Sequence, residues 1–411
     1  MKAYRFPIIL LSSIIIGGII GVLFGEKAMV LKPFGDVFLN AMFTVVVPLV
    51  FFTISASIAK MGGTKRLGKI MGSMLGVFLF TGLIAALYML AVVSVFPPAE
   101  GVKMEFETPE AVEEVSLADQ IVSTFTVPDF ADLFSRSNML SLIVFSVLLG
   151  IAVSAIGEKG KPFSAFLTSG SEVMMKIVSY IMYYAPIGLG AYFATLVGQY
   201  GPMLLGTYFK SGIIYYVSSF IYFAAAFTFF AFLAGKMRGV RVFWKNMLSP
   251  TVTSLATCSS AASIPVNLEA TKKMGIAPDI RETTIPLGAA LHKDGSVLGG
   301  VLKIVFLFGI FGKDFSGFGT ITSVILVAIL VGTVMGAIPS GGMIGEMLIL
   351  SLYGFPPEAL PIIAAISTII DPPATMLNVT GDNAASMMVS RAVEGKDWMK
   401  KQAEKILTKT A

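Results

Sequence analysis

The chain has 411 residues, of which 55% are hydrophobic and only 13% are charged, and its net charge is +5. Soluble proteins carry about 25% charged residues, so this composition excludes an ordinary soluble domain and indicates an integral membrane protein. The single cysteine excludes a disulfide framework and a multi-cysteine metal site. The basic residues lie mostly in polar connections and in the tail, which fits one face of a membrane and predicts no nucleic-acid partner.

Apolar runs long enough to cross about 30 Å of hydrocarbon recur along the chain, and the alternating segments of a β-barrel do not, which predicts an all-α membrane protein. The first spans are predicted at residues 7–25, 37–60, 68–97, 121–156 with a break, 164–199 and 206–235. If these spans alternate, the basic connections fall on one side and the acidic segment 100–114 falls on the other. The positive-inside rule then places both termini in the cytoplasm and the protein in the cell membrane.

The pattern changes after residue 245. Residues 246–276 are apolar at both ends and polar at the centre, which predicts a re-entrant helical hairpin, and residues 318–357 repeat this pattern with an interruption at 338–342. An apolar helix with a polar interruption follows each hairpin, at 281–312 with a break at 292–295 and at 359–392 with a break at 378–382. A hairpin plus a broken helix, used twice, predicts inverted repeats around a transport site near the membrane midplane.

Five short motifs carry a resemblance to a known family. They are YAPIG at 184–188, SSAASIP at 259–265, PLGAALHKDGS at 286–296, IPSGG at 338–342 and NVTGD at 378–382. In order and spacing the chain resembles the glutamate transporter, or dicarboxylate/amino acid:cation symporter, family, as a divergent prokaryotic-type member. The resemblance implies eight transmembrane helices, two re-entrant hairpins, a homotrimer and an elevator mechanism, in which a transport domain moves across the bilayer against a fixed scaffold.

The resemblance also implies a division of the chain into domains. Scaffold helices 1 and 2 would lie in residues 1–70 and scaffold helices 4 and 5 in residues 121–215. Helix 3 and an extracellular loop, residues 71–120, would join the transport domain, which continues through residues 216–411 with helix 6, both hairpins, both broken helices and a cytoplasmic tail.

Two aspartates inside apolar spans are the candidate ligands of coupling cations. Asp382 is costly in a membrane unless it is paired or ligating, and sodium prefers carboxylate and carbonyl oxygens. The resemblance implies that Asp382 binds sodium with the backbones of Gly288 and Asn378, although helix amides could instead satisfy this carboxylate. Asp294 resembles the carboxylate of a second sodium site, but only one of its three third-helix helpers keeps an oxygen, since these positions hold Thr81, Gly82 and Phe78.

The family's usual Asn-Met-Asp reads His-Lys-Asp at residues 292–294. His292 cannot offer an amide oxygen but can accept a hydrogen bond and titrates near neutrality, unless it is simply packed against a helix. Lys293 must pair with a carboxylate or lose its proton, with Asp294 and Glu346 as candidate partners. Lys293 could replace a transported cation or exchange protons with Glu346, whereas retained coupling to several sodium ions is the alternative. We expect no cofactor other than sodium or a proton as the coupling ion, and Lys303 is expected to reach the extracellular interface without a role.

The family binds its substrate through serines on the first hairpin tip, through the second tip at Gly341, and through an Asp-x-x-Arg-Thr-x-x-Asn series. By resemblance, the backbone near Ser259 and Ser260, where a hairpin helix begins, would bind the α-carboxylate. Asp371 would accept the ammonium, and Thr375 and Asn378 would bind polar groups of the substrate. The arginine that grips a second carboxylate is replaced by Ala374, and its alternative place on the first hairpin holds Cys258.

This loss of a bidentate partner predicts a small neutral amino acid as substrate. The alternative is an acidic amino acid or a C4-dicarboxylate, with Lys293 supplying the positive charge. Pro372 and Pro373 are expected to bend their helix and free carbonyl groups. Two further classes are disfavoured. An enzyme using Cys258, Ser259 or Ser260 with His292 and Asp294 lacks a nucleophile elbow and would not explain two similar interrupted halves. A passive channel would use an aqueous pathway between moving domains.

Overall fold

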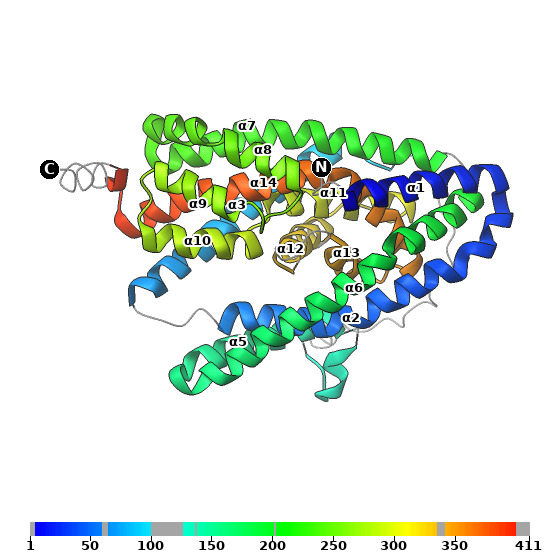
Figure 1. The fold of residues 1–411 in the computed structure, drawn as a ribbon, viewed down its shortest axis with the longest axis horizontal. Coiled ribbons are helices and arrows are strands. Elements are labelled where there is room, and N and C mark those ends of the chain that lie inside the picture. Colours follow the sequence, from blue (N-terminus) through cyan, green and yellow to red (C-terminus); the bar gives the residue numbers. More distant parts are fainter. Residues whose placement is uncertain are drawn as a thin grey trace.

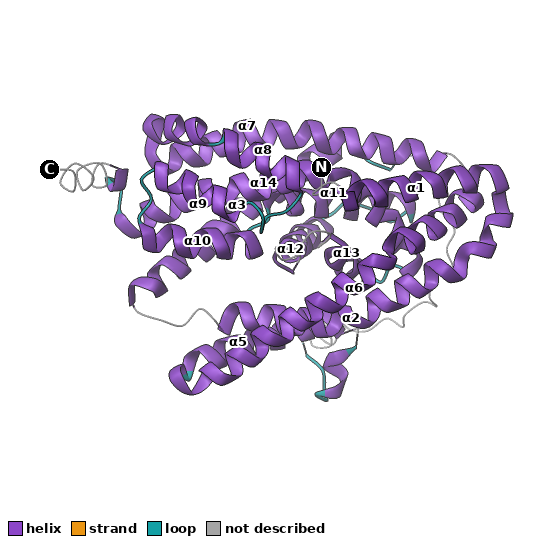
Figure 2. Cartoon of the chain, viewed as in Figure 1, coloured by secondary structure: helices purple, strands orange, loops and turns teal. Residues whose placement is uncertain are grey.

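A computed structural model describes residues 5–59, 65–99, 126–135, 138–200, 203–334 and 342–399. All regular elements of these residues are helices, and the described part contains no strand (Figure 2). Five of the described helices are long and apolar enough to cross a membrane: Ser12–Phe38, Gly68–Val95, Gly157–Gln199, Gly206–Asn246 and Pro357–Glu394. The prediction of an all-helical protein with several apolar spans is therefore confirmed.

One group of helices comes from the first half of the chain. It comprises α1 (Arg5–Phe24), η1 (Gly25–Leu31), α2 (Lys32–Ala59), η2 (Ala131–Phe134), α5 (Met139–Ala155), η4 (Gly157–Gly160) and α6 (Lys161–Tyr200). Helix α6 packs along α1 and α2, and α2 packs along α5 (Figure 1). Gly17 and Gly21, one turn apart on α1, lie directly against the α6 backbone at Gly190 and Ala194, where a Cβ atom would overlap it. Small residues four positions apart let membrane helices approach closely.

A second group comprises α3 (Lys65–Val95), α7 (Met203–Asn246) and the elements that follow α7. Helix α7 packs along α14 and is kinked at Gly235 and Lys236, which have non-helical backbone angles. The kink frees two carbonyl groups: Arg391 donates to Leu233 O, and Trp398 Nε1 donates to Ala234 O at 2.9 Å. Because α7 starts at Met203, the predicted domain boundary at residue 215 falls inside a continuous helix.

The first hairpin consists of α8 (Leu248–Thr257) and α9 (Ile264–Lys273), and its tip begins at Cys258 in a left-handed conformation with φ of 47°. The next helix is interrupted: α10 (Pro278–Leu291) ends before His292, and α11 (Asp294–Ile310) begins after Lys293. The second hairpin consists of α12 (Phe318–Val334) and α13 (Gly342–Tyr353), followed by η5 (Pro357–Ala359). Its tip, including Gly341, lies outside the described residues.

The prediction of a break at residues 378–382 is wrong, because α14 (Leu360–Glu394) is one continuous helix. The polar groups of this motif are satisfied without unwinding: Thr380 Oγ1 donates to Met376 O at 2.6 Å, and Asn267 Nδ2 donates to Val379 O at 2.8 Å. Gly381 instead makes room for a neighbour, since a Cβ there would lie 3.2 Å from His292 Cε1.

Pro372 and Pro373 lie inside α14 without ending it. Proline removes the N–H that would bond the carbonyl four residues earlier, so Pro373 leaves Ile369 O without its helical donor. Tyr216 of α7 supplies a substitute, with its hydroxyl donating to Ile369 O at 3.1 Å. The packing of α7 against α14 therefore satisfies a carbonyl group that proline frees.

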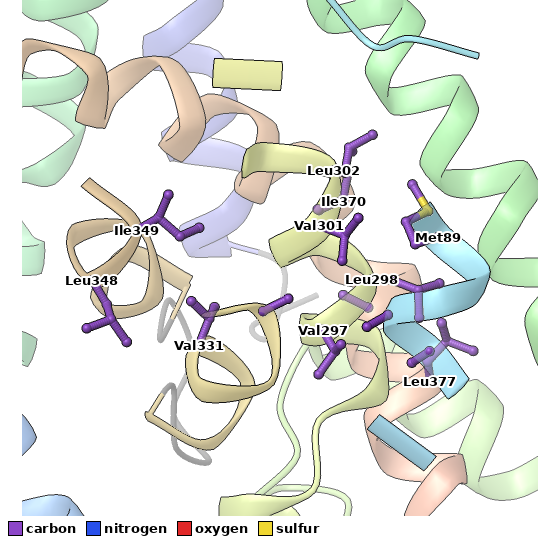
Figure 3. Packing of buried hydrophobic residues seen from close by; sticks show 14 of the residues in the cluster. Met89, Val297, Leu298, Val301, Leu302, Val331, Leu348, Ile349, Ile370 and Leu377 are labelled. Carbon is purple, nitrogen blue, oxygen red and sulfur yellow. The ribbon is translucent and has the colours of Figure 1, made fainter. Parts of the chain in front are cut away.

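Helix α11 lies at the centre of the second group and contacts α3, α12, α13 and α14. Figure 3 shows its apolar side chains meeting those of these four helices; the labelled residues are Met89, Val297, Leu298, Val301, Leu302, Val331, Leu348, Ile349, Ile370 and Leu377. A helix that is apolar all round is buried all round. This position places the interruption at His292 and Lys293, just before α11, in the interior of the molecule.

Candidate functional site

The interruption between α10 and α11 brings three polar side chains into the interior. His292, Lys293 and Asp294 are 1%, 5% and 1% exposed. Lys293 has backbone angles of φ −141° and ψ 57°, outside the helical region, so the chain changes direction between the two helices. Tyr215 of α7 donates to Gly295 O at 2.7 Å and fixes the start of α11. Three consecutive residues can therefore face different neighbours.

His292 lies between the two aspartates that the sequence assigns to cations. Its Nδ1 is 3.0 Å from Asp382 Oδ1, and its Nε2 is 3.3 Å from Asp294 Oδ1. Nε2 is also hydrogen-bonded to Thr81 Oγ1 at 2.7 Å, and the ring stacks on Phe78 with centroids 4.5 Å apart. The imidazole therefore fills the space between the two carboxylates. It also contacts Thr81 and Phe78 of α3, two of the three positions that the resemblance assigns to the second sodium site.

The backbone groups predicted for sodium lie in helical segments of the protein. Gly288 O accepts a hydrogen bond from His292 N at 2.8 Å, and Asn378 lies inside the continuous helix α14, where its side-chain amide exchanges hydrogen bonds with Ser296. Asp382 lies over Gly288, where a Cβ would come within 2.5 Å of Oδ1. Among the described residues there is no group of three or more His, Cys, Asp or Glu side chains that could bind a metal.

Asp294 is the least satisfied of these oxygen ligands. Tyr222 of α7 donates to its Oδ2 at 3.3 Å, whereas its Oδ1 has no hydrogen-bond partner within the described chain. Carboxylate and hydroxyl oxygens are suitable ligands for a hard cation. The chemistry of Asp294, Asp382 and Thr81 thus fits a cation, but the His292 ring lies where a cation shared by the two carboxylates would have to lie.

Lys293 faces the first hairpin and not the carboxylates predicted for it. Its Nζ donates to Ser260 Oγ at 2.8 Å, and no carboxylate of the described chain lies within 4.0 Å of this ammonium. The predicted pairing of Lys293 with Asp294 or Glu346 is therefore wrong. The side chains of Lys293 and Asp294 diverge at the helix break, and Glu346 already has another partner.

That partner is Lys303, which the sequence left without a role. Lys303 Nζ lies 3.2 Å from Glu346 Oε1 and is only 2% exposed, so the expectation that it reaches the extracellular interface is wrong. Ser367 Oγ accepts from Lys303 Nζ at 2.8 Å and was not anticipated. A single serine in an apolar helix gives no signal in the sequence, since its partner is 64 residues away.

The predicted substrate residues lie on two elements. On α14, Thr375 donates to Asp371 Oδ1 at 3.1 Å, while Ala374 packs against Gly295 at the start of α11. At the first hairpin tip, Ser259 Oγ accepts from Ala262 N at 3.3 Å. Helix α9 starts at Ile264, later than the predicted start near Ser259 and Ser260, and Cys258 is buried.

A cavity of about 400 Å³ reaches this site from the boundary between the two helix groups. Its lining is mostly apolar and comes from α2 and α5 on one side and from α3, α11 and α12 on the other. Lys293 and Asp294 are the charged residues that line it. The charged site therefore borders the boundary along which the two groups face each other.

Comparison with known proteins identifies the family of the chain. The family model described as "Sodium:dicarboxylate symporter family" matches residues 6–392. A proton/sodium-glutamate symport protein of Bacillus caldotenax is 30% identical over 92% of each chain. A C4-dicarboxylate transport protein of Bacillus subtilis is 27% identical over 95% of this chain and 94% of the relative, and a proton/glutamate-aspartate symporter of the same organism is 27% identical over 95% and 96%. The chain therefore belongs to the sodium:dicarboxylate symporter family and is a multi-pass membrane transporter, not an enzyme.

Proposed function

We propose that this protein is a cation-coupled symporter that imports an acidic amino acid or a C4-dicarboxylate. The observation that carries the proposal is the ammonium group of Lys293, which is buried, directed at Ser260 of the first hairpin tip and without a carboxylate partner among the described residues. A buried, unpaired charge is costly, and an anionic substrate would supply its counter-charge.

Lys293 would bind the second carboxylate of the substrate, which in other family members is bound by the arginine at the position of Ala374. The relatives named above as glutamate, aspartate or C4-dicarboxylate transporters favour this alternative over the neutral amino acid that Ala374 alone predicts. The Asp371 carboxylate accepts a hydrogen bond from Thr375. A carboxylate at this place attracts the ammonium group of an amino acid and repels a dicarboxylate. Within the proposal, an acidic amino acid is thus the preferred substrate.

The proposal includes how the substrate crosses the membrane. Helices α1, α2, α5 and α6 would form the scaffold, and α3 with the helices from α7 onward would move as the transport domain. The separate packing of the two groups and the apolar cavity between them support this division. We further propose a homotrimer in the cytoplasmic membrane with both termini inside, and coupling to sodium or protons, for which the relatives' names and the basic connections are the support.

Uptake into proteoliposomes tests the proposal with labelled aspartate, succinate and alanine under imposed sodium or proton gradients. The wild type should concentrate aspartate in preference to alanine. Replacing Lys293→Met removes a charged hydrogen bond worth about 1.5–3 kcal/mol, so its KM for aspartate should rise by about 10- to 150-fold. Lys293→Arg, which keeps the charge, is the matched control and should retain most of the affinity for aspartate.

Three results would count against the proposal. The first is a wild type that prefers alanine, which would restore the neutral-substrate prediction. The second is a Lys293→Met protein with unchanged affinity for aspartate. The third is ion conductance without saturable uptake, which would indicate a channel.

A further inference from the structure

A second buried charged cluster lies where α11, α13 and α14 meet. Lys303 of α11 pairs with Glu346 Oε1 of α13 at 3.2 Å and donates to Ser367 Oγ of α14 at 2.8 Å. The Ser367 hydroxyl donates to the same Glu346 oxygen, so each member contacts the other two. We call these three residues the Lys303 cluster. The cluster joins α13 of the second hairpin to α11, which belongs to the interrupted helix after the first hairpin, and to α14, which follows the second hairpin.

The energetics of this cluster are asymmetric. Lys303 is 2% exposed and Glu346 is 0% exposed, so both charges are withdrawn from water. Replacing both partners of a buried ion pair by apolar residues is often neutral, whereas removing one partner leaves an uncompensated charge. Glu346 Oε2 already has no hydrogen-bond partner in the described structure. The pair is therefore poorly explained as a stabilising contact, and a role in fixing the position of α13 explains it better.

The cluster lies next to the candidate substrate residues. Ser367, Asp371 and Ala374 are three or four positions apart on α14 and thus lie along one face of the helix. Gly342, the first residue of α13, packs on the cluster, since a Cβ there would lie 3.4 Å from both Glu346 Oε1 and Ser367 Oγ. Ser367, which contacts both Lys303 and Glu346, lies one helical turn before Asp371, so the two charges lie close to this carboxylate along α14. The cluster is thus placed to influence both the second hairpin and the ammonium-binding aspartate.

We infer that the Lys303 cluster is a positioning device for substrate binding: it fixes the start of α13 beside the substrate and keeps the charge near Asp371 balanced. This inference rests on the proposed transport function. If Glu346 is removed, the Lys303 ammonium becomes available to Asp371 and competes with the ammonium of the substrate. If Lys303 is removed, Glu346 and Asp371 become two unbalanced acids on neighbouring helices.

The test compares Lys303→Met, Glu346→Met and the double variant in proteoliposomes. Glu346→Met should raise the KM for aspartate by about tenfold and that for succinate, which has no ammonium, much less, and the double variant should return to within about threefold of the wild type. Trp398→Phe is the control, because it breaks a buried hydrogen bond to Ala234 far from the cluster and should lower stability without changing KM. Equal KM values in all variants, or a double variant as impaired as the single ones, would overturn the inference.

A second measurement does not depend on the substrate. A Gly342→Cys substitution in a Cys258→Ala background reports the position of the start of α13 through its rate of alkylation. Either single variant should raise this rate by about tenfold, and the double variant should restore it. Unchanged alkylation in the single variants would overturn the positioning role even if no uptake were found, whereas absent uptake with altered alkylation would contradict only the proposed function.

Discussion

Removing the imidazole of His292 should create a sodium site between Asp294 and Asp382. In the wild type the ring bonds Asp382 at 3.0 Å and Thr81 at 2.7 Å, and it lies 3.3 Å from Asp294. A His292→Ala substitution removes Nδ1 from Asp382 and Nε2 from Asp294, and it leaves a space lined by the oxygen-bearing side chains of these two aspartates and Thr81. Sodium is the abundant cation whose preferred ligands match these oxygens.

The magnitude follows from the contacts that are lost. A hydrogen bond to a charged group contributes about 1.5–3 kcal/mol and a neutral one about 0.5–1.5 kcal/mol, while the stacking on Phe78 adds about 0.5–1.5 kcal/mol. Without sodium, His292→Ala should therefore lower the free energy of unfolding by about 2.5–6 kcal/mol. If sodium binds only the folded protein, a sodium concentration of about 100 times its Kd raises the free energy of unfolding by about 2.7 kcal/mol. Sodium at this concentration should thus restore between about half and all of the lost stability.

Thermal unfolding of the purified protein in detergent, in sodium chloride and in choline chloride, measures this difference. The stabilisation by sodium should be larger for His292→Ala than for the wild type. Thr284→Val is a suitable control, because it breaks a buried hydrogen bond to Ser386 of 2.6 Å without opening the space between the aspartates. Equal stabilisation of the wild type and His292→Ala by sodium would refute the reasoning.

Two further predictions concern Gly288 and Asp279. Gly288→Ala should reduce uptake by at least about tenfold, because its Cβ would meet Asp382 Oδ1 at 2.5 Å and displace the carboxylate. Gly72→Ala is the control and should leave uptake unchanged, because its Cβ would meet nothing within 4 Å. Normal uptake by Gly288→Ala would contradict the placement of Asp382. Asp279 lies in the first turn of α10, outside the apolar spans, and the Arg66 guanidinium, hydrogen-bonded to it at 2.5 Å, holds the pKa of the Asp279 carboxyl below its ordinary value of 3.8. A lowered pKa adds stability above the unfolded-state value and loses it as the pH falls through the folded-state value. Asp279→Asn should therefore lose less than about 1 kcal/mol near neutral pH, and this loss should disappear as the pH falls below 3.8 and through the folded-state value, as pH-dependent unfolding would show. A difference that persists in strong acid would contradict this assignment.

The sequence determined the class of the protein and the outline of its second half. Composition and the length of apolar runs are local properties, so they were sufficient to predict a helical membrane protein. The polar stretch at residues 292–295 indicated a helix break because consecutive polar residues in an apolar span need partners that a regular buried helix does not offer. The motifs around residues 259, 294 and 378 then gave the family, which the comparison confirmed.

Local signals were misleading where a distant neighbour supplied the partner. The stretch around Asn378 and Gly381 looks like a second break, yet α14 continues through it because Asn267 and His292 pack against it. Likewise, Pro373 does not end the helix, since Tyr216 of α7 bonds the carbonyl group that it frees. Neither neighbour is visible from the residues that flank the motif.

The pairing of buried charges was decided only by the tertiary structure. The sequence singled out five ionisable residues as candidates for the site, but not which of them meet: His292, Lys293, Asp294, Asp382 and Glu346. Their contacts depend on the rotation of each helix about its axis and on the direction of the chain at the break, so His292 reaches Asp382 and Lys293 reaches Ser260. Since a buried charge is stabilised only by a partner within a few ångströms, these rotations decide which ammonium group pairs with a carboxylate, as in Lys303, and which has no carboxylate partner among the described residues, as in Lys293.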